Sequence, residues 1–378
     1  MNEPLRVLHL NSGNLYGGVE TFLLTLAECR DFVPRMQPEF GLCFGGRQED
    51  ELRASGCPVH SLGEVRFSRP WTVWRARRNL KLLLQTRSID VVVCHQPWIQ
   101  ALFGKVVSNC GRVYVAYFHG IAGHGWQEHK ASRTRPQLAI APSQYTLDTV
   151  RDWFPTTTRA VVHNPLPTRM RHVYEPTPIE RDQQRAALGA GPEDVVIFTA
   201  SRVEAVKGSD LLIEALTALR DYPRWQFWYA GAPQRPHEHD LFDRMKQMVH
   251  ESGIANRFRF LGSRADVPEL MKLVDVYAQA NRGPEGFGLS YLEAAYSYVP
   301  IVTTQPGSLG EMVDDTNGII VPANNVTAMA EALCNLIRDP HRRQTLGAGG
   351  RAKAIRQCDP QQQLSRLADL FLAARGMR

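Results

Sequence analysis

The stretch LRVLHLNSGNLYGGVETFLLTLAECR, residues 5–30, contains a short apolar run, a glycine-containing turn and a segment with helical periodicity. The run at 5–11 has the length and composition of a strand, and apolar side chains recur at helical spacing in 19–30. This order of strand, turn and helix is typical of the first unit of a parallel-sheet domain. The alternation continues to about residue 165 and begins again near residue 194, so the sequence predicts two such domains.

The expected domain boundary is rich in proline. Residues 164–182, NPLPTRMRHVYEPTPIERD, contain four prolines among polar residues, which is typical of a linker. We therefore place an N-terminal domain at 1–170, a linker at 171–189 and a C-terminal domain at 190–357. The last apolar-periodic segment, 358–378, lies beyond a second domain of normal size and is expected to cross back to the first domain.

Length and composition agree with two globular domains. The chain has 378 residues, 43% of them hydrophobic and 22% charged, and a domain usually takes roughly 150 residues. No segment offers the roughly 20 uninterrupted apolar residues of a membrane-spanning helix. The first residues, MNEPLRVLHLNSG, do not resemble a cleavable signal. We therefore expect a cytoplasmic, enzyme-sized protein.

Cysteine spacing and net charge say little about which ligands or macromolecules the protein binds. The seven cysteines form no CxxC pair and mostly lie in apolar segments, so disulfides and zinc are not expected. The formal charge of +6 permits an anionic partner, which could be nucleic acid, a lipid surface or a phosphorylated small molecule. Charge alone does not choose among these.

Ligands of parallel α/β sheets bind at the carboxyl ends of the strands, where helix N-termini present free N–H groups. After the first strand, Gly17 and Gly18 either bring such groups close to a phosphate or sugar, or form a structural turn. After the first strand of the second domain, Arg202 and Lys207 are a pair of cations suited to a diphosphate. The alternative is that they are solvated loop charges.

The stretch NRGPEGFGLSYLEAAY, residues 281–296, places two acids around a glycine-rich turn that opens a helix. Its glycines allow close backbone approach, and the N–H groups of 287–290 can meet an anion. A carboxylate beside a phosphate repels the ligand unless it accepts hydrogen bonds from hydroxyls, which indicates a ribose or a sugar. Stabilisation of the helix dipole, worth about 0.3–1 kcal/mol, explains Glu285 better than Glu293.

At this point the chain resembles the retaining glycosyltransferases of family four, which have the GT-B fold of two facing Rossmann-like domains with a central cleft. The resemblance covers nearly the whole chain. It is carried by GGVETFLLTLA, FHG at 118–120, APSQYT, HNPLP, SRVEAVKGSDLLIEAL, FLGSRADVPELM, PEGFGLSYLEAAYSYVPIVTT, GEMVDDTNGIIVPANN and RDPHRRQTLG.

The resemblance implies a role for each matching residue. Arg202 and Lys207 correspond to ligands of the donor diphosphate, Glu293 to the ligand of the nucleotide ribose, and Glu285 to the ligand of the donor sugar hydroxyls. His119 matches a histidine beside the transferred sugar. The remaining implied donor-binding positions are Gly17 and Gly18 under the phosphate, Gly262, Ser263 and Arg264 near the base, and Gly286, Phe287, Gly288 and Leu289 at the sugar and phosphate.

Three positions depart from the family pattern. The chain reads AQANRGPEGFG where the family often has Pro-Ser, so Arg282 and Pro284 put the sugar contacts in doubt. Asn164-Pro165 replaces a usual Asn-Gly, and Gly307-Ser308 replaces a frequent Gly-Gly. None of these changes removes a charged ligand of the donor.

The sequence lacks two kinds of catalytic residue, and this absence suggests a mechanism. No second carboxylate is placed as a nucleophile, as double displacement would need. We therefore expect front-face transfer, with the cations and helix N–H groups stabilising a diphosphate that helps deprotonate the acceptor. No Asp-x-Asp motif follows a strand, so no metal and no cofactor other than the sugar nucleotide are expected.

Family frequency makes a UDP-sugar, UDP-glucose in particular, the first donor expectation and GDP-mannose the next. The acceptor is expected to be a glycan or a lipid-linked sugar in polysaccharide or glycoconjugate biosynthesis. The alternative function is that of another GT-B enzyme, such as a sugar-nucleotide epimerase. Nucleic-acid binding is not expected, because basic residues and aromatics are interleaved in only one helix.

That helix lies in residues 66–87, RFSRPWTVWRARRNLKLLLQTR, which hold seven basic residues, no acids and two tryptophans. Such a segment either lies on an anionic membrane surface, at the inner membrane face, or has Trp71 and Trp74 packed inward. Among the histidines, His95 is either an acceptor-site group or a polar loop residue. The same choice applies, with less weight on the acceptor site, to His124 and His129.

Overall fold

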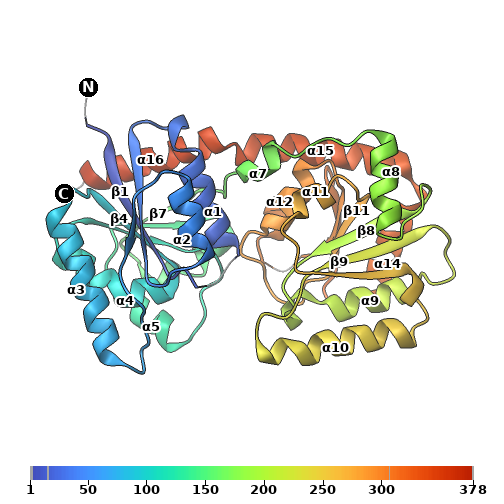
Figure 1. The fold of residues 1–378 in the computed structure, drawn as a ribbon, viewed down its shortest axis with the longest axis horizontal. Coiled ribbons are helices and arrows are strands. Elements are labelled where there is room, and N and C mark those ends of the chain that lie inside the picture. The colour runs from blue at the N-terminus through green and yellow to red at the C-terminus, as the bar shows by residue number, and fades with distance from the viewer. Residues whose placement is uncertain (1–2, 15–16, 306, 377–378) are drawn as a thin grey trace. The chain divides into compact units, whose positions relative to one another are not determined.

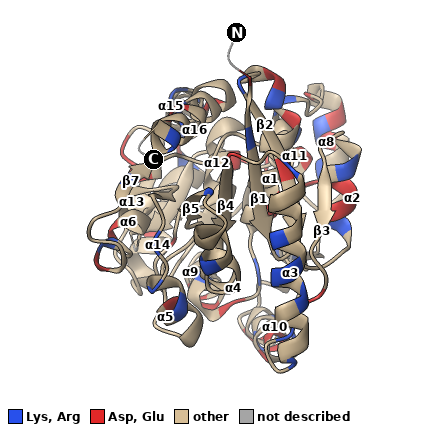
Figure 2. Ribbon diagram, turned by 90° about the vertical axis from the view of Figure 1, so that its left-hand side faces the viewer, with Lys and Arg blue, Asp and Glu red and all other residues tan. Residues whose placement is uncertain are grey.

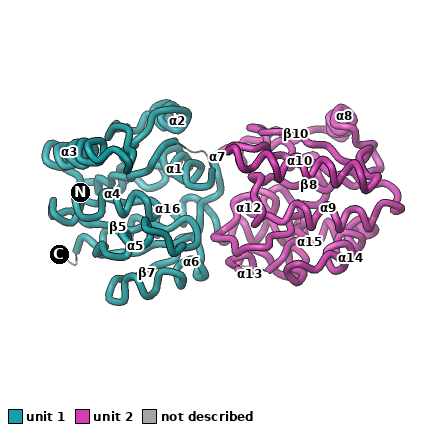
Figure 3. The backbone as a smooth tube through the Cα atoms, turned by 90° about the horizontal axis from the view of Figure 1, so that it is seen from below, with its two compact units in different colours: residues 1–168, 358–378 teal, residues 169–357 magenta. Residues whose placement is uncertain are grey.

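The computed structural model describes residues 3–14, 17–305 and 307–376, which form two compact units (Figures 1 and 3). Unit 1 comprises residues 1–168 and 358–378, and unit 2 comprises residues 169–357. Each unit is built around one parallel sheet, which confirms the prediction of two Rossmann-like domains. The proposed linker range, 171–189, belongs to unit 2 by its contacts.

Unit 1 has a parallel sheet of seven strands within the described residues. The strands are β1 (Leu5–Asn11), β2 (Met36–Leu42), β3 (Val59–Ser61), β4 (Val91–His95), β5 (Val113–Tyr117), β6 (Leu138–Ala141) and β7 (Thr158–Val161). The helices are α1 (Gly18–Glu28), α2 (Arg47–Ala54), α3 (Pro70–Thr86), α4 (Gln96–Asn109), α5 (Trp126–Ser132), α6 (Gln144–Asp148) and α16 (Pro360–Gly376), with short 3₁₀ turns η1 (Arg30–Phe32) and η2 (Arg151–Trp153).

The strand order of unit 1 is β3-β2-β1-β4-β5-β6-β7. Because β1 pairs with both β2 and β4, the direction of winding reverses at β1 and β4, and ligands of this fold bind outside the carboxyl ends at that point. Strand β4, VVVCH, is buried along its whole length, as expected for a parallel strand covered on both faces. One face packs against α1 and α16, and the other against α3 and α4.

Unit 2 repeats this plan. Its strands are β8 (Val195–Ala200), β9 (Trp225–Ala230), β10 (Phe258–Gly262), β11 (Val276–Gln279), β12 (Ile301–Thr304) and β13 (Gly318–Val321), in the order β10-β9-β8-β11-β12-β13. Its helices are α8 (Pro178–Ala187), α9 (Ser209–Thr217), α10 (Pro236–Glu251), α11 (Val267–Leu270), α12 (Leu289–Tyr296), α13 (Leu309–Met312), α14 (Val326–Arg338) and α15 (Pro340–Cys358), with η3 (Ala205–Lys207) and η4 (Ala255–Arg257). The short helix α7 (Thr168–Arg171) contains the first crossing between the units.

Helix α8 explains why most of the proline-rich segment belongs to unit 2. Thr177 and Glu180 form a reciprocal capping box at its N-terminus. Near its end the buried Arg185 donates to Asp275, at a distance of 2.9 Å from Nη1 to Oδ2. A helix that is capped and tied to the sheet in this way is an element of the domain, which the four prolines did not indicate.

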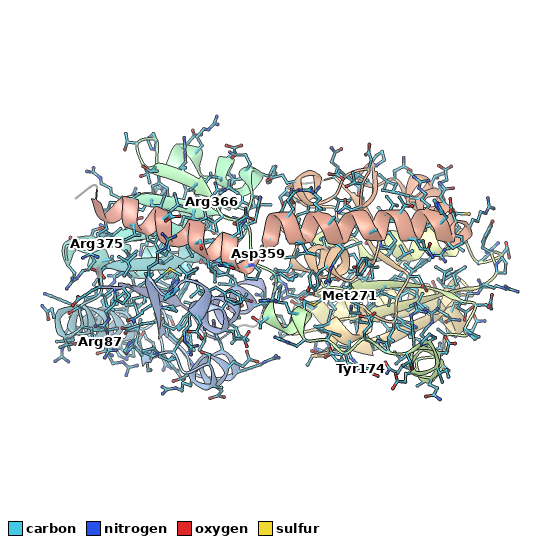
Figure 4. All side chains as sticks on the ribbon, turned by 90° about the horizontal axis from the view of Figure 1, so that it is seen from above. Arg87, Tyr174, Met271, Asp359, Arg366 and Arg375 are labelled. Atoms are coloured by element: carbon cyan, nitrogen blue, oxygen red, sulfur yellow. The ribbon has the colours of Figure 1, made fainter. Side chains whose placement is uncertain are left out.

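The C-terminal helix α16 returns to unit 1, as predicted. Leu364, Leu367 and Phe371 are buried in the same hydrophobic cluster as α1 and β1. Ion pairs add to this packing, including one of 3.3 Å between Arg375 and Asp90. Figure 4 labels Arg366 and Arg375 on this helix. The chain therefore completes the core of its first domain with its last helix. In the part of the chain that the structure describes, no helix has the length and apolar character needed to span a membrane.

We predict that Phe371→Ala lowers the free energy of unfolding of unit 1 by about 3–5 kcal/mol, because it leaves a cavity under the sheet. Leu372→Ala, one residue further along and 40% exposed, is the matched control and should cost much less. Urea unfolding followed by tryptophan fluorescence measures both. Equal losses for the two variants would show that α16 does not complete this core.

Candidate functional site

Three loops at neighbouring strand ends form the candidate site of unit 2. They follow β8, β11 and β12, which lie side by side at the point where the strand order reverses. The loop after β8 carries Arg202 and Lys207, the loop after β11 carries Glu285, and the loop after β12 carries Gly307. Residues that are far apart in the sequence are thereby brought to one edge of the sheet.

An ion pair joins the first two loops. Nζ of Lys207 lies 2.6 Å from Oε2 of Glu285, and the two side chains are 18% and 19% exposed. The backbone N–H of Gly286 donates to the other oxygen of Glu285, at 3.1 Å. The lysine predicted to bind a diphosphate is therefore held by the acid predicted to bind the sugar hydroxyls.

Two glycines allow these loops to approach. Gly208 has φ +63°, and a Cβ there would overlap the carbonyl oxygen of Ala280. Gly307 has φ +84°, and a Cβ there would overlap the backbone of Glu285. The adjacent Ser308 donates from both its N–H and its hydroxyl to the carbonyl of Glu285, at 2.9 and 3.0 Å. The departure Gly307-Ser308 therefore adds a hydrogen bond that fixes the acidic loop.

The second acid, Glu293, is buried on α12 and pairs with Arg169. Nη2 of Arg169 lies 2.6 Å from Oε1 of Glu293, and the side chains are 40% and 5% exposed. Arg169 was not predicted from the sequence, because it lies in the proline-rich segment, 124 residues before its partner. Glu293 is therefore compensated by a partly exposed cation that reaches it from the crossing segment.

The buried hydroxyl of Tyr277 is influenced by both acids. The hydroxyl of Tyr277, on β11, lies 2.8 Å from both Gln279 Oε1 and Ser290 Oγ. Burial raises the pKa of Tyr277, and the charges of Glu293 and Glu285 raise it further. The charges of both acids therefore act on the same buried hydroxyl.

The other predicted residues of unit 2 have simpler surroundings. Arg202 is half exposed and pairs with Glu204 at 2.8 Å. Arg264 pairs in a bidentate way with Asp266, just after Gly262 ends β10 with φ +69° and Ser263 follows. At the start of α12, Gly286 and Phe287 are buried, and Gly288 is the left-handed N-cap before Leu289, without a capping side chain.

In unit 1 the predicted glycines open α1. Gly17 is the N-cap residue of α1 in an extended conformation, and Gly18 is its first residue. A Cβ on Gly17 would make only ordinary contact with Glu20, at 3.8 Å. Packing against the described residues of unit 1 therefore does not require glycine at position 17.

His119, by contrast, ends a line of three imidazoles. Nε2 of His119 lies 2.7 Å from Nδ1 of His95, and Nε2 of His95 lies 3.0 Å from Nδ1 of His9. His9 lies opposite Val93 in the sheet, and His95 lies opposite Tyr117, so each step to the next strand moves two residues toward the carboxyl edge on one face. His9 was missed, because its place in this line depends on strand register.

Burial keeps the three rings neutral. His9 and His95 are inaccessible to solvent, and desolvation lowers the pKa of His9 and of His119 to about 3. The pKa of His95 is lowered well below its usual value by desolvation and then by its two histidine neighbours. The line is therefore uncharged at neutral pH.

The remaining histidines and the basic helix lie elsewhere on unit 1. His124 and His129 line a small cavity with Glu128, Ser132 and Trp153. On α3, Trp71 and Trp74 are 63% and 65% exposed, which excludes the interpretation that they pack inward. Figure 2 shows the Lys and Arg positions along α3 in blue.

Comparisons with known proteins agree with this architecture. A family model described as Glycosyltransferase Family 4 matches residues 16–169, and one described as Glycosyl transferases group 1 matches residues 180–353. The crystal structure of Anabaena Alr3699/HepE in complex with UDP and glucose has a TM-score of 0.84 and 22% identity, covering 98% of this chain and 100% of that one.

Two curated relatives are 29% and 26% identical, and the first of them matches only about half of this chain. The lipopolysaccharide core biosynthesis mannosyltransferase LpsB of Rhizobium meliloti is 29% identical over 51% of this chain, and the match spans 56% of its own length. A GDP-mannose-dependent monoacylated alpha-(1-6)-phosphatidylinositol monomannoside mannosyltransferase of Corynebacterium glutamicum is 26% identical, with 89% of each chain covered.

We predict that mild acid destabilises unit 1 through its histidines. The unfolded chain binds protons with a pKa near 6.5, whereas folded His9 and His119 bind them only near pH 3. Between these values the unfolded state holds more protons, so the free energy of unfolding is largest above pH 6.5 and falls as pH decreases. The fall to pH 5 should be about 2 kcal/mol per histidine.

Urea unfolding at pH 7.5 and pH 5 measures this fall. His9→Phe should reduce the pH dependence, whereas His341→Phe, at an exposed position on α15, should leave it unchanged. A wild-type stability that is flat between these pH values would contradict the neutral buried line.

Proposed function

This chain belongs to the group 1 glycosyltransferases of family four, and on that premise we propose that it moves a hexose from a nucleoside-diphosphate sugar to a glycan or lipid-linked acceptor. The observation that carries the proposal is the pairing of Lys207 with Glu285 beside Glu293, at the carboxyl ends of neighbouring strands. A cation and two acids at one strand edge suit a ligand that has both a diphosphate and hydroxyls.

Donor binding is an exchange of partners in this proposal. The diphosphate replaces Glu285 as the partner of Lys207, and a sugar hydroxyl donates to the carboxylate that is released. Glu293 accepts from the ribose, with Arg169 as its compensating cation. Arg202, half exposed beside Glu204, can turn to the diphosphate as a second cation.

Transfer proceeds with retention at the front face and without a metal ion. Lys207, Arg202 and the uncapped N–H groups of α12 stabilise the departing diphosphate. The bond from the sugar to the diphosphate breaks as the bond to the acceptor oxygen forms, and the acceptor proton passes to the diphosphate. Once the diphosphate has taken its place beside Lys207, Glu285 accepts from a sugar hydroxyl and serves as a ligand rather than as a nucleophile.

The named relatives support GDP-mannose as the first donor to test. Two relatives that this chain matches over 89% and 79% of its length are named as GDP-mannose-dependent mannosyltransferases. The UDP-glucose expectation from family frequency stays a prediction, and the HepE complex, at 22% identity, supports the fold alone. The acceptors named for those relatives are phosphatidylinositol mannosides, which supports a lipid-linked acceptor here.

Helix α3 supplies a surface suited to such acceptors. Trp71, Trp74 and Arg78 lie three to four residues apart, so they share one helix face, and Arg78 lies 5.8 Å from the centroid of the Trp74 ring. Exposed tryptophans and basic side chains on one face are typical of helices that lie in an anionic membrane interface. We propose peripheral contact of α3 with anionic lipid.

We predict that Lys207→Ala and Glu293→Ala each weaken binding of the correct sugar nucleotide by about 10- to 100-fold, because each removes a charged partner of the ligand. Thermal shift with GDP, UDP and ADP identifies the base first, since a ligand at 100 times its dissociation constant stabilises by about 2.7 kcal/mol. Titration calorimetry then compares the variants with Lys246→Ala, an exposed lysine on α10.

Product analysis separates the alternatives. Release of a nucleoside diphosphate from GDP-mannose or UDP-glucose, undiminished by a chelator, supports metal-independent transfer. An epimerised sugar nucleotide would support the epimerase alternative. Unchanged donor affinity in both variants would contradict the assignment of this site.

We predict that replacing Trp71 and Trp74 together by alanine weakens binding to phosphatidylglycerol-containing vesicles by about tenfold or more, because the apolar anchors are lost. Vesicle sedimentation measures the effect, which should weaken at high salt. Tyr174→Ala removes an aromatic side chain that is 64% exposed on unit 2 and serves as the control. Equal binding by the double variant and the control would exclude α3 as the contact.

A further inference from the structure

His9, His95 and His119 form a line of three imidazoles, although a catalytic role would require only one of them. Its two contacts, of 3.0 and 2.7 Å, use Nδ1 of one ring and Nε2 of the next each time. The outer nitrogens, Nε2 of His9 and Nδ1 of His119, are buried and have no hydrogen-bond partner among the described residues. The line thus ends in one unpaired nitrogen at His119 and in another at His9.

The two ends have different surroundings. The ring of His9 lies 5.8 Å from that of Phe40 and 6.3 Å from that of Phe371, measured between centroids, in the core of unit 1. His119 lies in the loop after β5, at the carboxyl edge, where ligands of this fold bind. Tyr117 stacks on His119 at 4.4 Å and an interplanar angle of 7°, which fixes the orientation of the imidazole.

Neutral imidazoles in such a line cannot choose their tautomers independently. Each ring has one N–H and one lone pair, and each contact needs one of each. If His95 donates from Nδ1, then His119 accepts at Nε2 and carries its proton on Nδ1, while His9 donates from Nδ1 and leaves Nε2 bare. In the reverse direction His9 carries an N–H on Nε2 and His119 has a bare Nδ1. The protonation state of Nε2 of His9 therefore determines that of Nδ1 of His119.

The surroundings of His9 favour the first direction. Buried N–H groups without a partner are rarer in proteins than under-satisfied acceptors. A bare lone pair on Nε2 of His9, beside Phe40 and Phe371, is therefore the better of the two arrangements, because the N–H then lies on His119 at the carboxyl edge, where a ligand can accept it. It places the proton of His119 on Nδ1.

We propose that His9 and His95 are positioning residues that hold His119 as a neutral hydrogen-bond donor at Nδ1, available to a hydroxyl oxygen of a ligand at the carboxyl edge of unit 1. This inference rests on the proposed glycosyl transfer. Because Nε2 of His119 is occupied by His95, the imidazole has no lone pair with which to deprotonate the acceptor. The acceptor proton then goes to the departing diphosphate, in agreement with front-face transfer.

Nitrogen NMR of the intact protein with ¹⁵N-labelled histidine tests the tautomer without any assay of activity. At neutral pH we expect a protonated, pyrrole-type Nδ1 and a bare, pyridine-type Nε2 on His119, and the same pattern on His95. His119→Gln and His95→Gln spectra assign the signals. A bare Nδ1 on His119, or two protonated nitrogens on one ring, overturns the proposal.

Two substitutions at His95 separate positioning from packing. His95→Gln keeps an amide N–H that can donate to Nε2 of His119, whereas His95→Phe keeps a ring but removes both polar contacts. We expect His95→Phe to lose the single tautomer of His119 and to lower kcat about tenfold with little change in KM for the donor, the effect of losing one hydrogen bond in the transition state. His95→Gln should preserve both.

The outcomes also distinguish this inference from the proposed function. Equal kcat values and equal His119 spectra in the Gln and Phe variants overturn the positioning role, even if the enzyme transfers sugar. If no sugar nucleotide is turned over, the proposed function fails, and the tautomer pattern still decides whether the line has the direction inferred here. His341→Phe serves as the control for adding a phenyl ring at an exposed histidine.

Discussion

The ion pair between Lys207 and Glu285 is the interaction on which the candidate donor site depends. It joins the loops after β8 and β11, which leave the sheet in neighbouring positions and then turn toward different helices. Glycines at 208 and 307 permit the approach, and Ser308 ties the acidic loop to the loop after β12. Since both side chains are mostly buried, neither charge is stable there without a counter-charge. The pair therefore keeps the site assembled until a ligand supplies other partners.

The two units have the same sheet plan but differ in the charge of the side chains at the carboxyl ends of their strands. Unit 2 balances buried carboxylates with cations, at Lys207 and again at Arg169. Unit 1 has neutral imidazoles on the corresponding strands, because desolvation disfavours their charged forms. One edge is thus suited to a charged ligand that exchanges ion partners, and the other to uncharged hydroxyls that exchange hydrogen bonds.

The sequence was sufficient for the architecture, whereas the donor-binding role of the charged residues that it indicated stays a proposal. Strand and helix periodicity predicted both parallel sheets, and glycine turns after strands indicated Lys207, Glu285 and Glu293. What it could not supply was the register between strands and the contacts of the crossing segment. His9 joins His95 only because the sheet places it opposite Val93, and Arg169 reaches Glu293 across 124 residues. Neither relation leaves a local pattern.

The return of α16 to unit 1 has a consequence for how the chain folds during synthesis. Unit 2 is one continuous segment, 169–357, so all its parts are available once that segment has left the ribosome. Unit 1 begins earlier but lacks Leu367 and Phe371 under its sheet until the final turns emerge. Domains generally fold as units in the order of synthesis, and here the interrupted domain is completed last. During that interval the part of the α1 face of the sheet that α16 covers is exposed, and it is the surface that a chaperone would need to cover.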